Sequence, residues 1–336
     1  MKKIILLILI ILISLYSYGK VLTSLEEVSK PQLISVSKDY FLITEGATIF
    51  VYSMKDHKLV KKFGKAGEGP KEFKINPFGA PMIAYFIKGK IFVNSESKMS
   101  WWTSKGEFIS EKRTPAFAIF RPLGNQFVAS GQSTNDKDQM VLTVNLHDPK
   151  GKKIKELYKT DITVGPNAEF NYPYASFTFE PYKERLYLAR GTEGFVIEVK
   201  DMDGKTLYTI KKEFEKIKVD QTYKEKTFQS FKADPNFKQF YEFFKNRIKF
   251  KTYYPALQDV RVVDDRIHVI TFKKKDGKTE CRIMDLKGND LKTVYVPYPD
   301  LHGMDYIPKY DIFNKVIYIL IENEDDETWE LHTSNL

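Results

Sequence analysis

The sequence predicts an all-β protein that is built from six similar repeats. From residue 32 onwards, short runs rich in Ile, Val, Phe and Tyr alternate with turns of Gly, Asn, Asp and Lys, which is the pattern of antiparallel strands. The 336 residues include 20 Tyr and 25 Phe, and aromatic residues favour the half-buried surface of a sheet. Three markers recur in a constant order along the chain, and together they indicate six repeats.

Each marker is a short pattern with a structural reason. The first is a polar turn that leads directly into an apolar run, at Lys38-Asp39, Gly89-Lys90, Asn125-Gln126, Glu184-Arg185, Asp265-Arg266 and Asn314-Lys315. The second is a polar hairpin turn later in the repeat, at 104–107, 149–152, 202–205 and 286–289, with the glycine-free version 55–58 in the first repeat. The third is a proline beside an aromatic or apolar residue where each repeat begins, at Pro31, Pro77, Pro115, Pro173, Pro255 and Pro299.

Repeats of this kind fit the blades of a β-propeller. Each has room for a four-stranded antiparallel meander, so we expect a six-bladed β-propeller that forms a single domain over residues 20–336. The last repeat lacks a fourth strand, because only 315–322 and 328–334 remain for strands after its inner one. The segment 21–28 is left over at the other end. We expect it to pair with the last blade, which closes the ring and removes an exposed edge.

Residues 1–19 are typical of a secretory signal peptide. Met1-Lys2-Lys3 precede an apolar run from Ile4 to Leu15, and Ser17 and Gly19 stand at the −3 and −1 positions of a cleavage site. An uncleaved anchor is the alternative, although a membrane-spanning helix needs about 20 apolar residues. We therefore expect a secreted or periplasmic protein with no stable membrane span in the mature chain.

Charge and cysteine content narrow the possible partners. The formal net charge is +9, but only 8 of the 53 basic residues are Arg. Phosphate and base recognition favours the arginine fork, whereas dispersed Lys solvates turns and protects strand edges, so we expect no nucleic-acid partner. Cys281 is the only cysteine, which excludes an intrachain disulfide and a cysteine-based zinc site.

A glycine- and proline-rich link, Gly64–Phe73, separates the first two repeats. Its residues Gly67, Glu68, Gly69, Pro70, Glu72 and Phe73 resemble the G-x-G-P-G-E-F signature of exported bacterial six-bladed propeller proteins related to NHL repeats. The segment 91–109 is similar to an NHL blade. Lys71 replaces the glycine that is usual in the signature, and Asn94 replaces the Asp of NHL blades. The link has no G-K-[ST] ending, so we interpret it as a connector in which Phe73 anchors the seam between two blades.

Residues 220–250 interrupt the β pattern and predict a short helical insertion between blades 4 and 5. Asp234-Pro235 predicts a helix start, and Phe237, Phe240, Phe244 and Ile248 are spaced for one face of a helix. An earlier turn or two between Tyr223 and Phe231 is a further expectation. We expect the apolar face to pack on the propeller, and a lid, a partner-docking helix or a helix that lies on a membrane is the alternative.

The face that carries the interblade links surrounds the mouth of the central channel. Loops between second and third strands lie on the same face. The candidate ligand-binding residues of this face are Tyr172, Tyr174, Arg190, Glu193, Tyr253, Tyr254, Tyr298 and His302. Aromatic rings around a concave mouth can stack on a sugar or another flat ligand, while Arg190 and Glu193 hold its polar groups. The alternative is that the Tyr-Pro pairs wedge the blades together.

These features favour an exported, non-catalytic binding or scaffold module for a glycan, a peptide or an envelope protein. The sequence contains no G-x-S-x-G or H-E-x-x-H motif, so no residue is assigned to catalysis and no cofactor is expected. The alternative is a metal-assisted hydrolase, similar to six-bladed lactonases, with a divalent cation such as calcium in the channel. The candidate oxygen ligands for this cation are Asn76, Asn94, Glu169 and Asp300. No paired spacing in the sequence singles them out.

Overall fold

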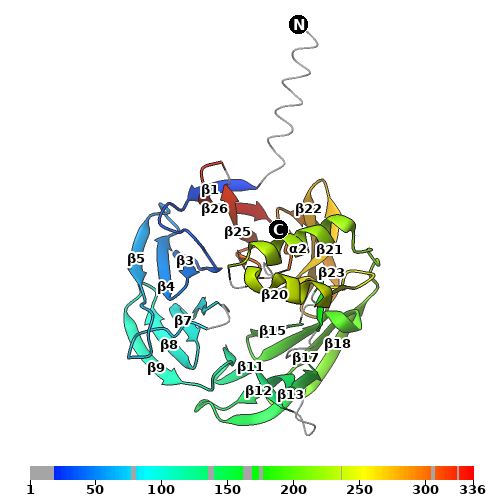
Figure 1. Ribbon diagram of the computed structural model, residues 1–336. Coiled ribbons are helices and arrows are strands. Elements are labelled where there is room, and N and C mark those ends of the chain that lie inside the picture. Colours follow the sequence, from blue (N-terminus) through cyan, green and yellow to red (C-terminus); the bar gives the residue numbers. More distant parts are fainter. Residues whose placement is uncertain are drawn as a thin grey trace.

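The protein is a six-bladed β-propeller, as predicted (Figure 1). The computed structural model describes residues 19–76, 81–134, 140–161, 169–173, 177–235, 237–303, 307–323 and 325–336, with only the backbone of Thr192. Residues 1–18 of the predicted signal peptide 1–19, and the predicted residues Pro77 and Tyr174, lie outside this part of the chain. Six four-stranded antiparallel sheets surround a central channel, and each blade runs from an inner strand to an outer strand.

The strands follow one another in chain order within blades 1 to 5. Blade 1 contains β2 (Leu33–Val36), β3 (Tyr40–Glu45), β4 (Thr48–Ser53) and β5 (Leu59–Phe63). Blade 2 contains β6 (Ile83–Ile87), β7 (Lys90–Ser95), β8 (Lys98–Thr103) and β9 (Phe108–Arg113). Blade 3 contains β10 (Ile119–Leu123), β11 (Gln126–Thr134), β12 (Met140–His147) and β13 (Lys153–Asp161).

The second half of the ring repeats this plan. Blade 4 contains β15 (Phe177–Tyr182), β16 (Arg185–Arg190), β17 (Phe195–Lys200) and β18 (Thr206–Lys212). Blade 5 contains β20 (Asp259–Val263), β21 (Arg266–Lys275), β22 (Lys278–Asp285) and β23 (Asp290–Val296). Blade 6 contains β24 (Tyr310–Phe313), β25 (Val316–Asn323), β26 (Thr328–Asn335) and the N-terminal strand β1 (Lys20–Ser24).

The N-terminal strand closes the ring, as the leftover segment predicts. β1 pairs antiparallel with β26 and forms the outer edge of blade 6 (Figure 1). The chain then continues inward, where Leu25 is fully buried and its N–H donates to the Trp329 carbonyl at 2.8 Å. Trp329 Nε1 in turn donates to the Ser29 carbonyl at 3.1 Å. The two ends of the chain are therefore joined by backbone pairing and by a shared core.

Apolar cores fill the seams between neighbouring blades. Leu25 belongs to the cluster between blades 6 and 1, together with Phe41 of β3 and Leu331 of β26. Equivalent clusters lie in the five other seams, and a separate cluster lies beneath the insertion. Burial between sheets supplies most of the stabilisation of such a fold, because each blade buries both of its faces only against its neighbours.

The hairpin markers connect the third and fourth strands of blades 1 to 5. In two of them, Gly204 and Gly288 have φ values of 72° and 90°, a region that favours glycine. A β-carbon at Gly204 would lie 2.3 Å from Leu157 of blade 3, and one at Gly288 would lie 2.6 Å from Ile210 of blade 4. Glycine therefore suits these turns through its backbone conformation, and a β-carbon there would force the Leu157 or Ile210 side chain of the preceding blade to shift.

The link Gly64–Phe73 folds as a tight connector between blades 1 and 2. Phe73 is 1% exposed and packs against Trp102, with ring centroids 5.7 Å apart. Glu72 Oε2 accepts the Gly69 N–H at 2.9 Å, and Lys98 Nζ donates to the Gly69 carbonyl at 2.7 Å. Lys71 has a φ of 63°, a conformation that glycine adopts more readily than lysine, and glycine is the residue usual at this position of the signature. Glu72 therefore stabilises the loop itself, and Phe73 packs in the seam between blades 1 and 2.

The insertion between blades 4 and 5 is present, but its main helix lies earlier than Asp234-Pro235 predicts. Helix α2 (Gln221–Ala233) begins after Asp220, whose side chain accepts the Tyr223 N–H at 2.8 Å. Asp234 ends this helix, and its carboxylate then caps a short turn by accepting the Phe237 N–H at 3.1 Å. The expected start at Asp234 is therefore wrong for the long helix.

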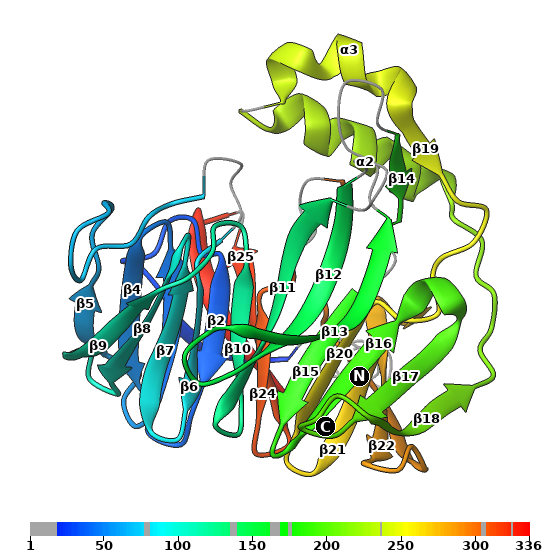
Figure 2. The ribbon, with the colours of Figure 1, turned by 90° about the horizontal axis from the view of Figure 1, so that it is seen from below.

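Only short turns follow Pro235. They are η2 (Lys238–Phe240), α3 (Tyr241–Phe244) and η3 (Lys245–Arg247), and they lead into β19 (Ile248–Phe250). Aromatic residues have modest helix propensity, which fits the short turns of this aromatic-rich stretch. β19 pairs in parallel with β14 (Phe170–Tyr172) from the link before blade 4. This pairing ties the insertion to the face of the propeller, above which it stands (Figure 2). Within the described residues, no helix is long and apolar enough to cross a membrane.

Candidate functional site

The central channel holds a cavity of about 2090 Å³. Residues from the inner strands of all six blades line it. The insertion contributes Tyr223, Phe231 and Phe237, and the link before blade 6 contributes Leu301 and His302. The lining also includes Lys88, Gly89 and Glu184 from turns between first and second strands, so the cavity extends along the channel to its other mouth.

One equivalent position in each inner strand forms a ring around this cavity. Each of these residues pairs with the residue seven positions later, which is the middle of the apolar run that begins the second strand. The six residues all line the cavity, and we name them the channel ring: Ser35, Tyr85, Arg121, Glu180, Arg261 and Asp311. Five of the six are ionisable, although they stand in otherwise largely apolar strands.

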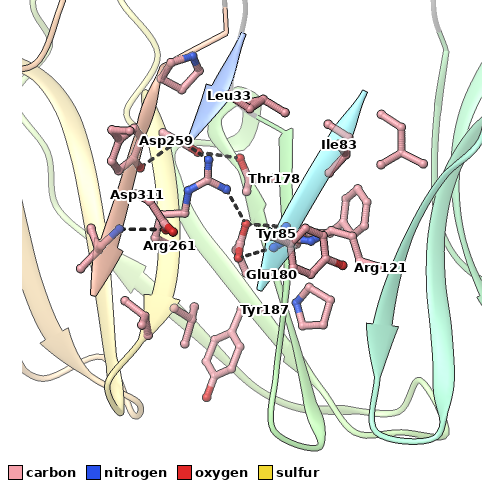
Figure 3. A pocket seen from close by; sticks show the side chains of 18 of the residues that line it. Leu33, Ile83, Tyr85, Arg121, Thr178, Glu180, Tyr187, Asp259, Arg261 and Asp311 are labelled. Carbon is pink, nitrogen blue, oxygen red and sulfur yellow. Dashed lines mark hydrogen bonds and ion pairs between the residues drawn. The ribbon is translucent and has the colours of Figure 1, made fainter. Parts of the chain in front are cut away.

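Glu180 is bonded to two other members of the channel ring. Arg121 donates to its two oxygens at 2.5 and 2.8 Å, and Arg261 donates to Oε1 at 2.9 Å (Figure 3). The Glu180 side chain is only 5% exposed. Burial opposes its ionisation, but the two guanidinium groups outweigh that effect and hold the pKa of this carboxyl below its usual value. The three residues join blades 3, 4 and 5.

Asp259 extends this network from the layer next to the ring. Arg261 Nη2 lies 3.5 Å from Asp259 Oδ2, and the Tyr310 hydroxyl of blade 6 donates to the same oxygen at 3.0 Å. The Thr178 hydroxyl of blade 4 donates to Oδ1 at 3.3 Å. Burial, followed by the Asp259 charge, raises the pKa of Tyr310 well above its usual value, so this phenol remains a donor.

The remaining ring members connect the other neighbouring blades. Asp311 of blade 6 accepts the Val36 N–H of blade 1 at 2.7 Å, and Ser35 accepts the Phe86 N–H of blade 2 at 3.2 Å. The Arg121 guanidinium lies over the Tyr85 ring, 5.8 Å from its centroid. Burial raises the pKa of Asp311 to about 6. Each blade thus contacts the next through a polar group at the ring.

An apolar layer lies on the insertion side of the channel ring. Leu33, Ile83 and Ile119 stand two residues before the ring positions of blades 1, 2 and 3, so their side chains point to the same side of each strand. Ile119 is 39% exposed within this cavity. We name the space between this layer and the insertion the channel chamber. It has an aliphatic wall on blades 1 to 3 and aromatic side chains from the insertion.

Three of the predicted site residues lie at or beside the channel chamber. Tyr172 is 2% exposed and stacks edge-on with Phe231, 5.9 Å between centroids. His302 lies 5.1 Å from Tyr223 of α2, and Tyr254 lies 5.3 Å from the same ring. Tyr172 and His302 line the cavity, whereas Tyr254 lines a smaller cavity of about 440 Å³ between blades 4 and 5.

The other predicted residues are not gathered with them. Tyr298 is 4% exposed and packs on Tyr310, 5.2 Å between centroids, so it is part of the seam between blades 5 and 6. Arg190 Nη1 bonds Glu193 Oε1 at 2.9 Å in η1 (Gly191–Glu193), and neither residue lines the cavity. Tyr253 is 40% exposed beside Lys216. Tyr174 lies outside the described residues.

Three of the four candidate metal ligands are held by separate partners. Asn94 Oδ1 accepts the Phe120 N–H at 2.5 Å, Asn76 Nδ2 donates to Glu96 at 3.0 Å, and Asp300 pairs with Lys274. In the part of the chain that the structure describes, no three His, Cys, Asp or Glu side chains form a group that suits a metal ion.

The channel ring was missed by the sequence interpretation, although its signal is present. Arg121, Glu180, Arg261 and Asp311 each precede the middle of the next apolar run by seven residues, and each interrupts an apolar strand with a charge. Aligning the repeats on that run would have placed these residues in one layer of the channel.

Comparisons with known proteins return likenesses to solved structures. No family model matches the chain, and no curated protein matches it. The Pan2 WD40 domain of Neurospora crassa is 7% identical, with a TM-score of 0.45, over 91% of this chain and 89% of that one. The β-propeller domain of Cps50 (Swd1) from Myceliophteria thermophila is 9% identical, with a TM-score of 0.40, over 95% and 100%. A protein of unknown function from Bacteroides caccae is 11% identical, with a TM-score of 0.41, over 81% and 83%.

Proposed function

We propose that this protein is an exported, non-catalytic binding module that holds a polypeptide segment of an envelope protein in the channel chamber. The observation that carries the proposal is the aliphatic and aromatic boundary of the chamber, which is one part of the channel cavity of about 2090 Å³. Pockets for small molecules usually measure about 300–1,000 Å³, so the channel as a whole has room for a polypeptide segment. Export is inferred from the signal-peptide pattern of residues 1–19 and from the resemblance of the Gly64–Phe73 link to exported propellers.

The boundary of the chamber favours a peptide over a glycan. Leu33, Ile83 and Ile119 offer aliphatic surface, which suits the apolar side chains of a peptide. A glycan buried in the chamber would need polar side chains that are free to bond its hydroxyl groups. Arg121, Glu180 and Arg261 are already engaged with one another.

The same engagement argues against the hydrolase alternative. A catalytic cation in the channel would need converging carboxylate oxygens. Glu180 is bonded by two guanidinium groups, and Asp259 by Arg261, Tyr310 and Thr178. A cation would have to displace these donors. We therefore place the hydrolase second, with a divalent ion such as calcium as its cofactor.

The test uses a matched pair of substitutions in the folded chain, residues 20–336. Ile119→Glu places a charge on the chamber wall, where Ile119 is 39% exposed, and Ile109→Glu makes the same change at a residue that is 41% exposed on outer strand β9. Both are screened with the unsubstituted chain against a displayed library of random peptides and a glycan array. We expect peptide binding by the unsubstituted chain and Ile109→Glu, with a loss of about tenfold or more in Ile119→Glu.

Each contrary result removes a defined part of the proposal. Glycan binding without peptide binding contradicts the class of ligand. Equal peptide binding by both variants contradicts the chamber as the site. A tightly held, stoichiometric divalent ion in the purified protein contradicts the non-catalytic role.

A further inference from the structure

We infer that the tip of the insertion docks this protein on the surface of an anionic lipid membrane. We define the tip as the residues from Lys238 to Lys249, which include η2, α3 and η3. Phe240 and Phe243 are 51% and 57% exposed, although such large apolar side chains are usually covered. Figure 2 shows that α3 projects beyond the face of the propeller, away from the blades.

The exposed rings rest on a fixed aromatic base. Phe244 lies beneath them, with centroids 6.4 Å from Phe240 and 5.3 Å from Phe243. Phe244 also contacts Phe170 at 5.5 Å and Phe237 at 6.0 Å, which belong to the apolar cluster under the insertion. Phe240 and Phe243 pack on this base and are still more than half exposed, so they are available to a partner.

The charge around these rings identifies the kind of partner. The tip contains four basic residues and one acidic residue, Glu242, which pairs with Lys245. Lys238 and Lys249 are exposed at the tip, and the Arg247 guanidinium lies over the Phe243 ring at 4.0 Å. Aromatic side chains enter the boundary between headgroups and acyl chains, while neighbouring cations bind anionic headgroups.

Docking through this tip has a geometric consequence. The insertion also lines the channel cavity through Tyr223, Phe231 and Phe237, so its tip and the channel mouth face the same way. A membrane bound by Phe240 and Phe243 would thus lie opposite that mouth. The inference does not depend on what the chamber binds.

Vesicle sedimentation tests this inference with the folded chain, residues 20–336. The probes are vesicles of phosphatidylcholine alone and vesicles of phosphatidylcholine mixed equally with phosphatidylglycerol. We expect the chain to bind the mixed vesicles, to bind the neutral ones weakly, and to lose binding as the salt concentration rises. The affinity of the variant F240S/F243S for the mixed vesicles should be lower by about tenfold or more.

Two further variants separate membrane docking from general effects. Leu291→Ser changes a residue that is 52% exposed on outer strand β23, and it should bind as the unsubstituted chain does. K238E/K249E should weaken binding to the mixed vesicles while leaving the rings in place. Far-ultraviolet circular dichroism checks that all variants are folded. Full binding by F240S/F243S overturns the inference. No vesicle binding by the unsubstituted chain also overturns it, and would indicate that the tip binds a protein partner instead.

Discussion

Glu180 accepts two hydrogen bonds from Arg121, at 2.5 and 2.8 Å, across the seam between blades 3 and 4. A third bond, from Arg261 at 2.9 Å, brings blade 5 to the same carboxylate. Exposed ion pairs add little to stability, because solvent screens them. This pair is largely withdrawn from solvent, so removal of one partner leaves charges that neither water nor protein satisfies.

We therefore expect Glu180→Ala to reduce the free energy of unfolding by about 3–5 kcal/mol, the usual cost of breaking a buried ion pair. The reason is that Arg121 and Arg261 would face each other without a carboxylate between them. Urea denaturation followed by tryptophan fluorescence measures the change. Glu193→Ala is the matched control, because Glu193 pairs with Arg190 but its side chain is 46% exposed, and its cost should be about 0.5 kcal/mol or less. Equal effects of the two substitutions would contradict a stabilising role of the ring.

Asp311 should make stability depend on pH in the opposite sense to most carboxylates. Burial raises its pKa from 3.8 to about 6, so its contribution is fully present below the unfolded value and is lost as the pH rises through about 6. The corresponding free energy is at most about 3 kcal/mol, less the part that solvent screens. The difference in unfolding free energy between the unsubstituted chain and Asp311→Asn should thus fall between about pH 4 and pH 7. Parallel curves for the two proteins across this range would show that Asp311 does not titrate in this way.

Much of the fold could be predicted because its determinants are local and repeated. The turn before each second strand, the hairpin glycines and the unpaired segment at 21–28 follow from backbone conformation and period-two alternation. The start of helix α2 could not be chosen on capping alone, because both Asp220 and Asp234 are good cap residues. The helix begins after Asp220 because Tyr223, Thr227 and Phe231, spaced four residues apart, are buried on one side of it. That burial depends on packing against the face of the propeller.

The site was harder to predict, since it depends on contacts between blades far apart in the chain. Of the residues predicted from the links, Tyr172 and His302 do line the cavity. Charges inside strands, such as Arg121 and Arg261, are not predicted in this way, because their partner Glu180 is distant from each in sequence. Ring symmetry brings such positions together, and it becomes visible only when the repeats are aligned.

Ring closure predicts a large effect for one residue near the N-terminus. Leu25 is fully buried between blades 6 and 1, so Leu25→Ala should lower the unfolding free energy by about 2–5 kcal/mol, through lost burial and the cavity that remains. Val21→Ala, in the same segment but 46% exposed, should cost about 0.5 kcal/mol or less. Urea denaturation of both variants provides the comparison. A small effect of Leu25→Ala would mean that the N-terminal segment is not needed to hold the ring closed.

The hairpin glycines allow backbone strain to be separated from steric contact between blades. Gly204 and Gly277 have almost the same φ, 72° and 73°, so alanine at either position should cost about 1 kcal/mol for the left-handed conformation. A β-carbon at Gly277 would meet nothing within 4 Å, whereas one at Gly204 would lie 2.3 Å from Leu157 of the preceding blade. Gly204→Ala should therefore cost about 1–3 kcal/mol more than Gly277→Ala in urea denaturation, because the Leu157 side chain must leave its packed position in the seam between blades 3 and 4. Equal costs would show that the seam yields to the added methyl group, and that the glycine is kept at this turn for its backbone conformation alone.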